Sequence, residues 1–288
     1  MPETMQVETP HEVRGIDALL SEQFAAHLDS LAQSKAAEYQ GNTPYPHIYF
    51  DNFLPIEVAE AALQAFPEPR EADWHASRDV NQRRKLAFDV VERLPEPIRD
   101  VLWFLNSRPM LKFLETLTGI RGVLPDPYYA GGGLHQIRPG GLLEVHADFS
   151  YHKQLRLDRR INVLIYLNKD WKEEYGGHFE LWDRTVTRAE KKILPLFNRC
   201  TIFSTTSESF HGHPQPLACP PDRNRKSIAT YYYTNGRPEE DPGLTHRHEV
   251  DFRARPGLNS VKMTLQIKKA IRSLTPPIFT DLYRALRR

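Results

Sequence analysis

The sequence predicts a mainly β protein with flanking helices, in which a sandwich or barrel of short antiparallel strands lies between two helical parts. Short β-like runs separated by turn signals fill residues 128–235, whereas helical spacing of apolar residues is found on both sides. The 288 residues are enough for one sizeable core, because β barrels of this size often form a single domain. We therefore divide the chain into 1–120, 121–240 and 241–288.

The first part, 1–120, is expected to be mostly helical and to pack on the core. Apolar residues recur at three- and four-residue steps over 19–31, before a break at 41–44. The aromatic and β-branched segment 46–53 predicts a strand, and residues 57–66 predict a helix. An apolar stripe over 97–117 predicts a further helix.

The middle part is expected to hold the strands. They are predicted at 131–137, 142–149, 161–168, 178–183, 200–205 and 227–234. In the last part, a helical stripe over 263–274 is stopped by Pro276 and Pro277. The basic residues around that stripe are interpreted as a solvated helix face.

Composition and charge exclude several classes of protein. The 38 lysines and arginines against 37 acidic residues leave a net charge of +1, which disfavours a nucleic-acid partner. The longest apolar run, 161–167, is far shorter than a membrane-spanning helix, and the N-terminus lacks a signal-peptide layout. Two cysteines are too few for a disulfide framework. We expect a cytoplasmic protein with reduced thiols and no membrane or nucleic-acid partner.

A histidine–x–aspartate triplet is the first candidate for chemistry. His146 and Asp148 lie on a predicted strand, where residues two apart face the same side and can bind one metal ion. The same triplet at His27 and Asp29 lies in a predicted helix, where residues two apart do not face each other.

A non-haem iron site of the two-histidine, one-carboxylate type needs one more histidine. His211 and His213 are the candidates, and they follow the strand at 200–205. Arg225 opens the last predicted strand, where its guanidinium could hold a carboxylate, and the hydroxyl of Ser227 shares its strand face. Arg159 and Arg160 are either contacts for an anionic substrate or ordinary strand-end charges.

With these residues, the sequence resembles the iron(II)- and 2-oxoglutarate-dependent dioxygenases, in their prolyl 4-hydroxylase-like branch. The resemblance covers residues 134–235. The matching positions, in chain order, are Pro139–Gly140, His146 and Asp148, the run Tyr166-Leu167-Asn168-Lys169-Asp170-Trp171, Gly176–Gly177, Phe203, His211 and Arg225. The run that ends in Trp171 is similar to that of the oxygen-sensing prolyl hydroxylases.

The resemblance implies a double-stranded β-helix (jelly-roll) core, and a metal site made by His146, Asp148 and His211. It also implies that Arg225 pairs with the distal carboxylate of 2-oxoglutarate, helped by Tyr166 and Ser227. The implied cofactors are Fe(II), 2-oxoglutarate and O2, with ascorbate as a candidate reductant.

Several residue assignments stay open at this point. Asn162 shares a strand face with Tyr166, so it either reaches the co-substrate pocket or is a satisfied polar residue of the core. The family motif favours His211 over His213 as the ligand. The long interval that follows His211 leaves Arg223 or Lys226 as alternatives to Arg225.

One position departs from the family pattern. Many members carry a tyrosine before the Pro-Gly turn, but this chain has Ile137 and Arg138 there. The co-substrate pocket is therefore expected to be lined differently.

The activity implied is hydroxylation of an unactivated C–H bond of a prolyl residue, an amino acid or another small molecule, with release of succinate and CO2. The alternatives are another metal-dependent jelly-roll (cupin-like) enzyme and a non-catalytic binding module. The substrate is thus a small molecule or a peptidyl group. The terminal parts could cap its pocket or form a homodimer interface.

Overall fold

The computed structural model describes residues 15–77, 79–238 and 248–256. Its helices are α1 (Gly15–Leu20), α2 (Glu22–Gly41), α3 (Ile56–Gln64), α4 (Glu96–Leu105) and α5 (Arg108–Thr118), with 3-10 turns η1 (Val91–Arg93) and η2 (Glu173–Tyr175). The first strands are β1 (His47–Phe50), β2 (His75–Ala76), β3 (Gln82–Phe88), β4 (Leu124–Pro125), β5 (Gly133–Ala147), β6 (Tyr151–His152) and β7 (Leu157–Tyr166). The later strands are β8 (Phe179–Trp182), β9 (Ala189–Ile193), β10 (Arg199–Ser204), β11 (His211–His213), β12 (Arg225–Thr234) and β13 (Asp251–Phe252).

The strands form one curled antiparallel sheet, with the order β1-β10-β7-β12-β5-β11-β8-β9. Strand β5 joins the two halves of this sheet. Its first residues pair with β12, where Ile137 lies opposite Arg225, and its last residues pair with β11, where His146 lies opposite His211. The result is a jelly-roll with the double-stranded β-helix fold, as predicted.

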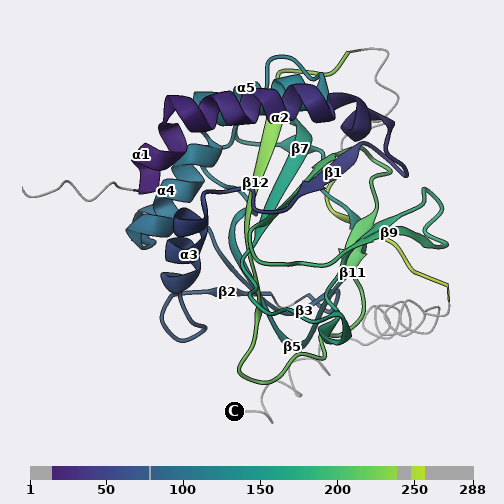
Figure 1. The fold of residues 1–288 in the computed structure, drawn as a ribbon. Helices are drawn as coiled ribbons and strands as arrows, with labels where there is room; N and C mark the ends of the chain where they lie inside the picture. The colour runs from purple at the N-terminus through teal and green to yellow at the C-terminus, as the bar shows by residue number, and fades with distance from the viewer. Residues whose placement is uncertain (1–14, 78, 239–247, 257–288) are drawn as a thin grey trace, which may run out of the picture.

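The alternation of residues along β7 explains how the layers pack. Ile161, Val163 and Ile165 belong to the main core and pack with apolar residues of the helices. Their neighbours Asn162 and Leu164 point the other way, into the interior of the jelly-roll. Figure 1 shows the helices gathered on one side of the curled sheet. The helical layer therefore covers the outer face, and the inner face is left for a site.

The elements predicted in the N-terminal part are present, except that the helix expected over 97–117 is divided. Helices α2 and α3 and strand β1 lie where helical and β-like patterns predicted them. The single helix expected over 97–117 is two helices, α4 and α5, separated at Asn106 and Ser107. Pro109 lies in the first turn of α5, where its missing N–H costs nothing, but it could not continue a helix from α4.

Strand β3 was not predicted. Its sequence, Gln-Arg-Arg-Lys-Leu-Ala-Phe, is too rich in charge to read as a strand. It forms because it pairs with β5 over most of its length, from Gln82 opposite Leu143 to Phe88 opposite Leu134. Strand β9 is similarly charged and pairs with β8. A strand that forms because it pairs with a segment distant in sequence has little strand signal in its own residues.

Three further predictions concern the rest of the chain. The helix expected over 263–274 lies outside the described residues. Cys200 and Cys219 are both free and buried, as the default of reduced thiols predicted. Within the described ranges, no helix combines the length and the apolar character that a membrane span requires.

Candidate active site

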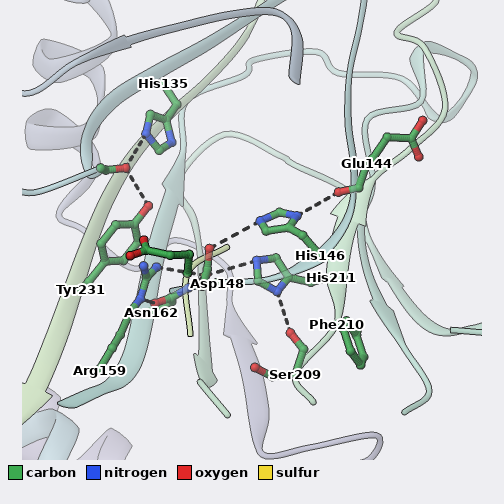
Figure 2. Close-up of polar contacts among 12 residues, drawn as sticks. His135, Glu144, His146, Asp148, Arg159, Asn162, Ser209, Phe210, His211 and Tyr231 are labelled. Carbon is green, nitrogen blue, oxygen red and sulfur yellow. Dashed lines mark hydrogen bonds and ion pairs between the residues drawn. The ribbon is translucent and has the colours of Figure 1, made fainter. Parts of the chain in front are cut away.

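Two histidines and an aspartate meet at the centre of the jelly-roll. His146 and His211 lie opposite each other on β5 and β11, and their ring centres are 4.5 Å apart. Asp148 follows the end of β5, and its two carboxylate oxygens each lie 3.4 Å from the Nε2 atom of one histidine. One ligand atom from each of the three residues lies within 4.8 Å of the others. Figure 2 shows the three side chains converging.

The orientation of both imidazole rings is set by backbone carbonyls. Nδ1 of His146 lies 2.8 Å from the carbonyl oxygen of Glu144, and Nδ1 of His211 lies 2.9 Å from that of Ser209. A carbonyl oxygen only accepts hydrogen bonds, so each Nδ1 carries the proton and each Nε2 presents a lone pair toward Asp148. Burial lowers the pKa of His146, which keeps its ring neutral. This donor set fits a divalent metal such as iron(II).

Asp148 is held by two side chains of β7. Arg159 donates from Nη2 to Oδ2 at 3.0 Å, and Asn162 donates from Nδ2 to the same oxygen at 2.6 Å. Arg159 also donates from Nε to Asn162 Oδ1 at 2.9 Å, and its guanidinium lies 4.4 Å from the ring centre of Phe149 and 3.5 Å from that of Tyr231. Burial alone would raise the pKa of Asp148, but the Arg159 guanidinium holds that pKa well below its usual range. The carboxylate is therefore ionised and fixed in place.

A second group of predicted residues lies on the neighbouring strands β12 and β7. Arg225 is 5% exposed and donates from Nε to the Gly177 carbonyl at 2.8 Å, and its guanidinium lies 4.9 Å from the ring centre of Tyr166. The Tyr166 hydroxyl is buried and has no hydrogen-bond partner in the described part of the chain. Ser227 lies opposite Tyr166 in the ladder of β12 and β7. A buried cation beside an unpaired hydroxyl fits the carboxylate of a small diacid such as 2-oxoglutarate.

The structure brings the predicted site residues into one place. His146, Asp148, His211, Arg225, Ser227 and Asn162 all line a single cavity, and Tyr166 lies behind Arg225. Asn162 combines the two alternatives that the sequence left open. It lines the cavity, and its side-chain amide is also satisfied by hydrogen bonds with Asp148 and Arg159.

The positions of the alternative metal ligand and of the alternative cations distinguish them from the favoured residues. His213 lines the cavity but is not part of the cluster that can hold a metal ion. Both of its ring nitrogens are buried and have no hydrogen-bond partner among the described residues. Arg223 donates to the carbonyl of Lys169, and Lys226 pairs with Glu68 at 2.9 Å. Neither of these two cations lines the cavity.

Two residues of the site were missed or misread from the sequence. Arg159 was interpreted as a substrate contact or a strand-end charge, but it is 1% exposed and pairs with Asp148. Lys85 of β3 also lines the cavity, and no motif in the sequence singles it out. Its strand position, opposite Ile137 of β5, is visible only after folding.

Comparison with known proteins finds a family match for part of the chain. Residues 132–233 match the model of the 2OG-Fe(II) oxygenase superfamily. No curated protein sequence matches the chain.

Among solved structures, the fold is similar to a prolyl hydroxylase from Trichoplax adhaerens that was solved with a peptide fragment of hypoxia inducible factor. The TM-score is 0.56 at 19% identity, over 75% of this chain and 95% of that one. It is also similar to a Pseudomonas putida prolyl-4-hydroxylase, with a TM-score of 0.50 at 15% identity over 71% of this chain and 99% of that one. The chain therefore carries a 2OG-Fe(II) oxygenase domain, the domain of iron(II)- and 2-oxoglutarate-dependent dioxygenases.

Proposed function

We propose that this protein hydroxylates an unactivated C–H bond of a prolyl residue, an amino acid or another small molecule. The observation that carries the proposal is one cavity lined both by a two-histidine, one-carboxylate cluster and by Arg225, which contacts Tyr166 behind it. Iron(II), 2-oxoglutarate and O2 supply the oxidising chemistry when bound, with release of succinate and CO2, and ascorbate is a candidate reductant.

Each group of residues has a separate role in this proposal. His146, Asp148 and His211 hold the metal through the two Nε2 atoms and one carboxylate. Arg225 holds the distal carboxylate of 2-oxoglutarate, with Tyr166 and Ser227 as further hydrogen-bond donors. Asn162 lines the same cavity and fixes the Asp148 carboxylate by a hydrogen bond. These roles position the reactants, which is a large part of catalysis by such sites.

The proposed substrate is a peptidyl group or a small molecule. The Trichoplax adhaerens relative was solved with a peptide, which makes a peptidyl substrate one candidate. A fold supports many substrates, so small molecules remain equal candidates. We also propose the division into 1–120, 121–240 and 241–288, supported by the family match at 132–233 within the middle part.

The test is an anaerobic titration of iron(II) and 2-oxoglutarate into metal-free protein. We expect the weak visible charge-transfer band of a keto acid chelated to iron(II), together with one bound metal per chain. Asp148→Ala and His211→Ala are expected to lose both signals. His213→Ala is the matched control, because it removes a buried histidine of the same strand while keeping the three ligands.

Each outcome separates the alternatives. Metal binding without the band, in protein with an unchanged circular dichroism spectrum, would indicate a cupin-like metal enzyme with different chemistry. Absence of metal binding in folded protein would favour a binding module. Loss of metal in His213→Ala with retention in His211→Ala would show that the ligand assignment is wrong.

A further inference from the structure

The cavity holds a cation that the proposed chemistry does not use. Lys85 is half-buried on β3 and lines the cavity, and it forms no hydrogen bond or ion pair with the residues that the structure describes. Burial lowers the pKa of Lys85 to about 8, while the Asp148 carboxylate opposes that change. An ammonium group facing a cavity without a partner indicates that something else neutralises it.

The position of Lys85 relative to Arg225 follows from strand pairing. Ile137 of β5 lies opposite Lys85 on one side and opposite Arg225 on the other. Residues paired in this way across neighbouring strands point to the same face of a sheet, and two strand spacings separate the two outer strands by about 10 Å. The two cations therefore face the same cavity at separate places.

The charges that line the cavity also leave the positive charge of Lys85 without a counter-charge. Asp148 is the only carboxylate among the described residues that line the cavity, and Arg159 already pairs with it. On the proposed function, the charges of iron(II) and the 2-oxoglutarate dianion cancel. The loaded cavity then keeps an excess of positive charge from Arg225 and Lys85, and such a cavity attracts anions.

The co-substrate is a poor partner for Lys85. In the proposed arrangement, one end of 2-oxoglutarate binds the metal and the other end pairs with Arg225, so neither carboxylate is free. Arg225 is 5% exposed, whereas Lys85 is half-buried and lies on β3, which pairs only with β2 and β5. Lys85 is thus less enclosed than Arg225, the residue proposed to hold the co-substrate.

We propose, on the basis of the function proposed above, that Lys85 binds an anionic group of the primary substrate, a carboxylate or a phosphate. The substrate is then an acidic small molecule or a peptide that carries an acidic group. Lys85 is a specificity-determining residue that places the substrate's reacting carbon over the metal site. His213 lines the same cavity, and its ring nitrogens have no hydrogen-bond partner in the described part of the chain, so it is available to hydrogen-bond the same ligand.

The test uses the full-length protein loaded with Mn(II) and saturating 2-oxoglutarate. The probes are acetate and inorganic phosphate, and the readout is the paramagnetic relaxation of the probe nuclei, which rises only when a probe binds near the metal. We expect a saturable rise for at least one probe, with a midpoint concentration at least about fivefold higher in Lys85→Met. Lys85→Arg is expected to keep the effect. Arg83→Met is the matched control, because it removes an exposed cation from the same strand.

The opposite results are equally specific. The same relaxation in wild-type protein and in Lys85→Met would overturn the proposal. Weaker 2-oxoglutarate binding in Lys85→Met, comparable with that in Arg225→Met and measured by calorimetry, would also overturn it, because Lys85 would then hold the co-substrate. Failure of the wild-type protein to bind 2-oxoglutarate would contradict the proposed function instead, and the probes would then be titrated into protein holding Mn(II) alone to decide on Lys85.

Discussion

The guanidinium of Arg159 and the carboxylate of Asp148 form an ion pair inside the protein, with Nη2 3.0 Å from Oδ2. Arg159 is fixed in turn by the rings of Phe149 and Tyr231 and by its bond to Asn162. The carboxylate that we assign to the metal is therefore held in place by side chains of the protein (Figure 2). Its charge is balanced by Arg159 when no metal is bound.

Replacing Arg159 by methionine tests this balance. We expect the metal-free variant to lose on the order of 3 kcal/mol of unfolding free energy, because Asp148 would keep a mostly buried charge without its partner. Added metal should recover part of that loss, so the rise in melting temperature on metal addition should be larger than in wild-type protein. The control is Arg93→Met, which breaks an exposed ion pair with Asp73 and should cost less than about 1 kcal/mol. Equal losses in the two variants would contradict a special role for Arg159.

Tyr166→Phe separates folding from co-substrate binding. The hydroxyl of Tyr166 has no partner in the described residues, so its removal should leave the unfolding free energy unchanged or slightly higher. Affinity for 2-oxoglutarate should fall by about tenfold, since a hydrogen bond to a carboxylate would be lost. Calorimetric titration of the metal-loaded protein measures the second effect, and urea unfolding measures the first. A large loss of stability without a change in affinity would show that Tyr166 is only part of the core.

Gly177 and Gly176 offer a matched pair of substitutions. Both have a positive φ, of 72° and 67°, so alanine brings backbone strain at each. A Cβ atom at Gly177 would lie 2.6 Å from a methyl carbon of Leu217 and 3.0 Å from Cδ of Arg225, whereas at Gly176 it would meet nothing within 4 Å. We expect Gly177→Ala to displace Arg225 and to weaken 2-oxoglutarate binding about tenfold more than Gly176→Ala does. Equal affinities in the two variants would argue against Arg225 as the carboxylate partner.

The metal-free protein should lose stability in mild acid. Burial lowers the pKa of His47, and burial together with the Lys85 charge lowers the pKa of His135 well below its ordinary value of 6.5. The unfolded chain therefore takes up protons near pH 6.5 while the folded chain does not, so this stability is present above about pH 6.5 and is lost as the pH falls. Each such histidine removes up to about 1.4 kcal/mol per pH unit. Urea unfolding between pH 7.5 and pH 5 should show the decline, and His135→Gln should make it shallower.

Much of the architecture follows from local patterns. The alternation of Ile161, Asn162, Val163 and Leu164 identifies a strand with one face on each layer, and the observed β7 has that arrangement. The His-x-Asp spacing likewise brought His146 and Asp148 together, because residues two apart on a strand share a face.

Other features depend on contacts that no local pattern contains. His211 and His213 share a face of β11, so spacing alone does not separate them; the distance from His211 to His146 and Asp148 does. Strand β3 exists because β5 pairs with it, and Lys85 enters the cavity by that pairing. The hydrogen bond between Arg159 and Asp148 joins residues eleven positions apart, one on β7 and one just after β5.

The carbonyl oxygens of Glu144 and Ser209 have an effect beyond the choice of tautomer. Each lies two residues before the histidine that it orients, on the same segment of chain, so both rings are aligned by their own backbone. The ligand geometry is thus preorganised by the folded apoprotein, and little side-chain entropy is lost when an ion arrives. We expect metal exchange to proceed without refolding of the jelly-roll, so that the same polypeptide can be emptied and reloaded repeatedly.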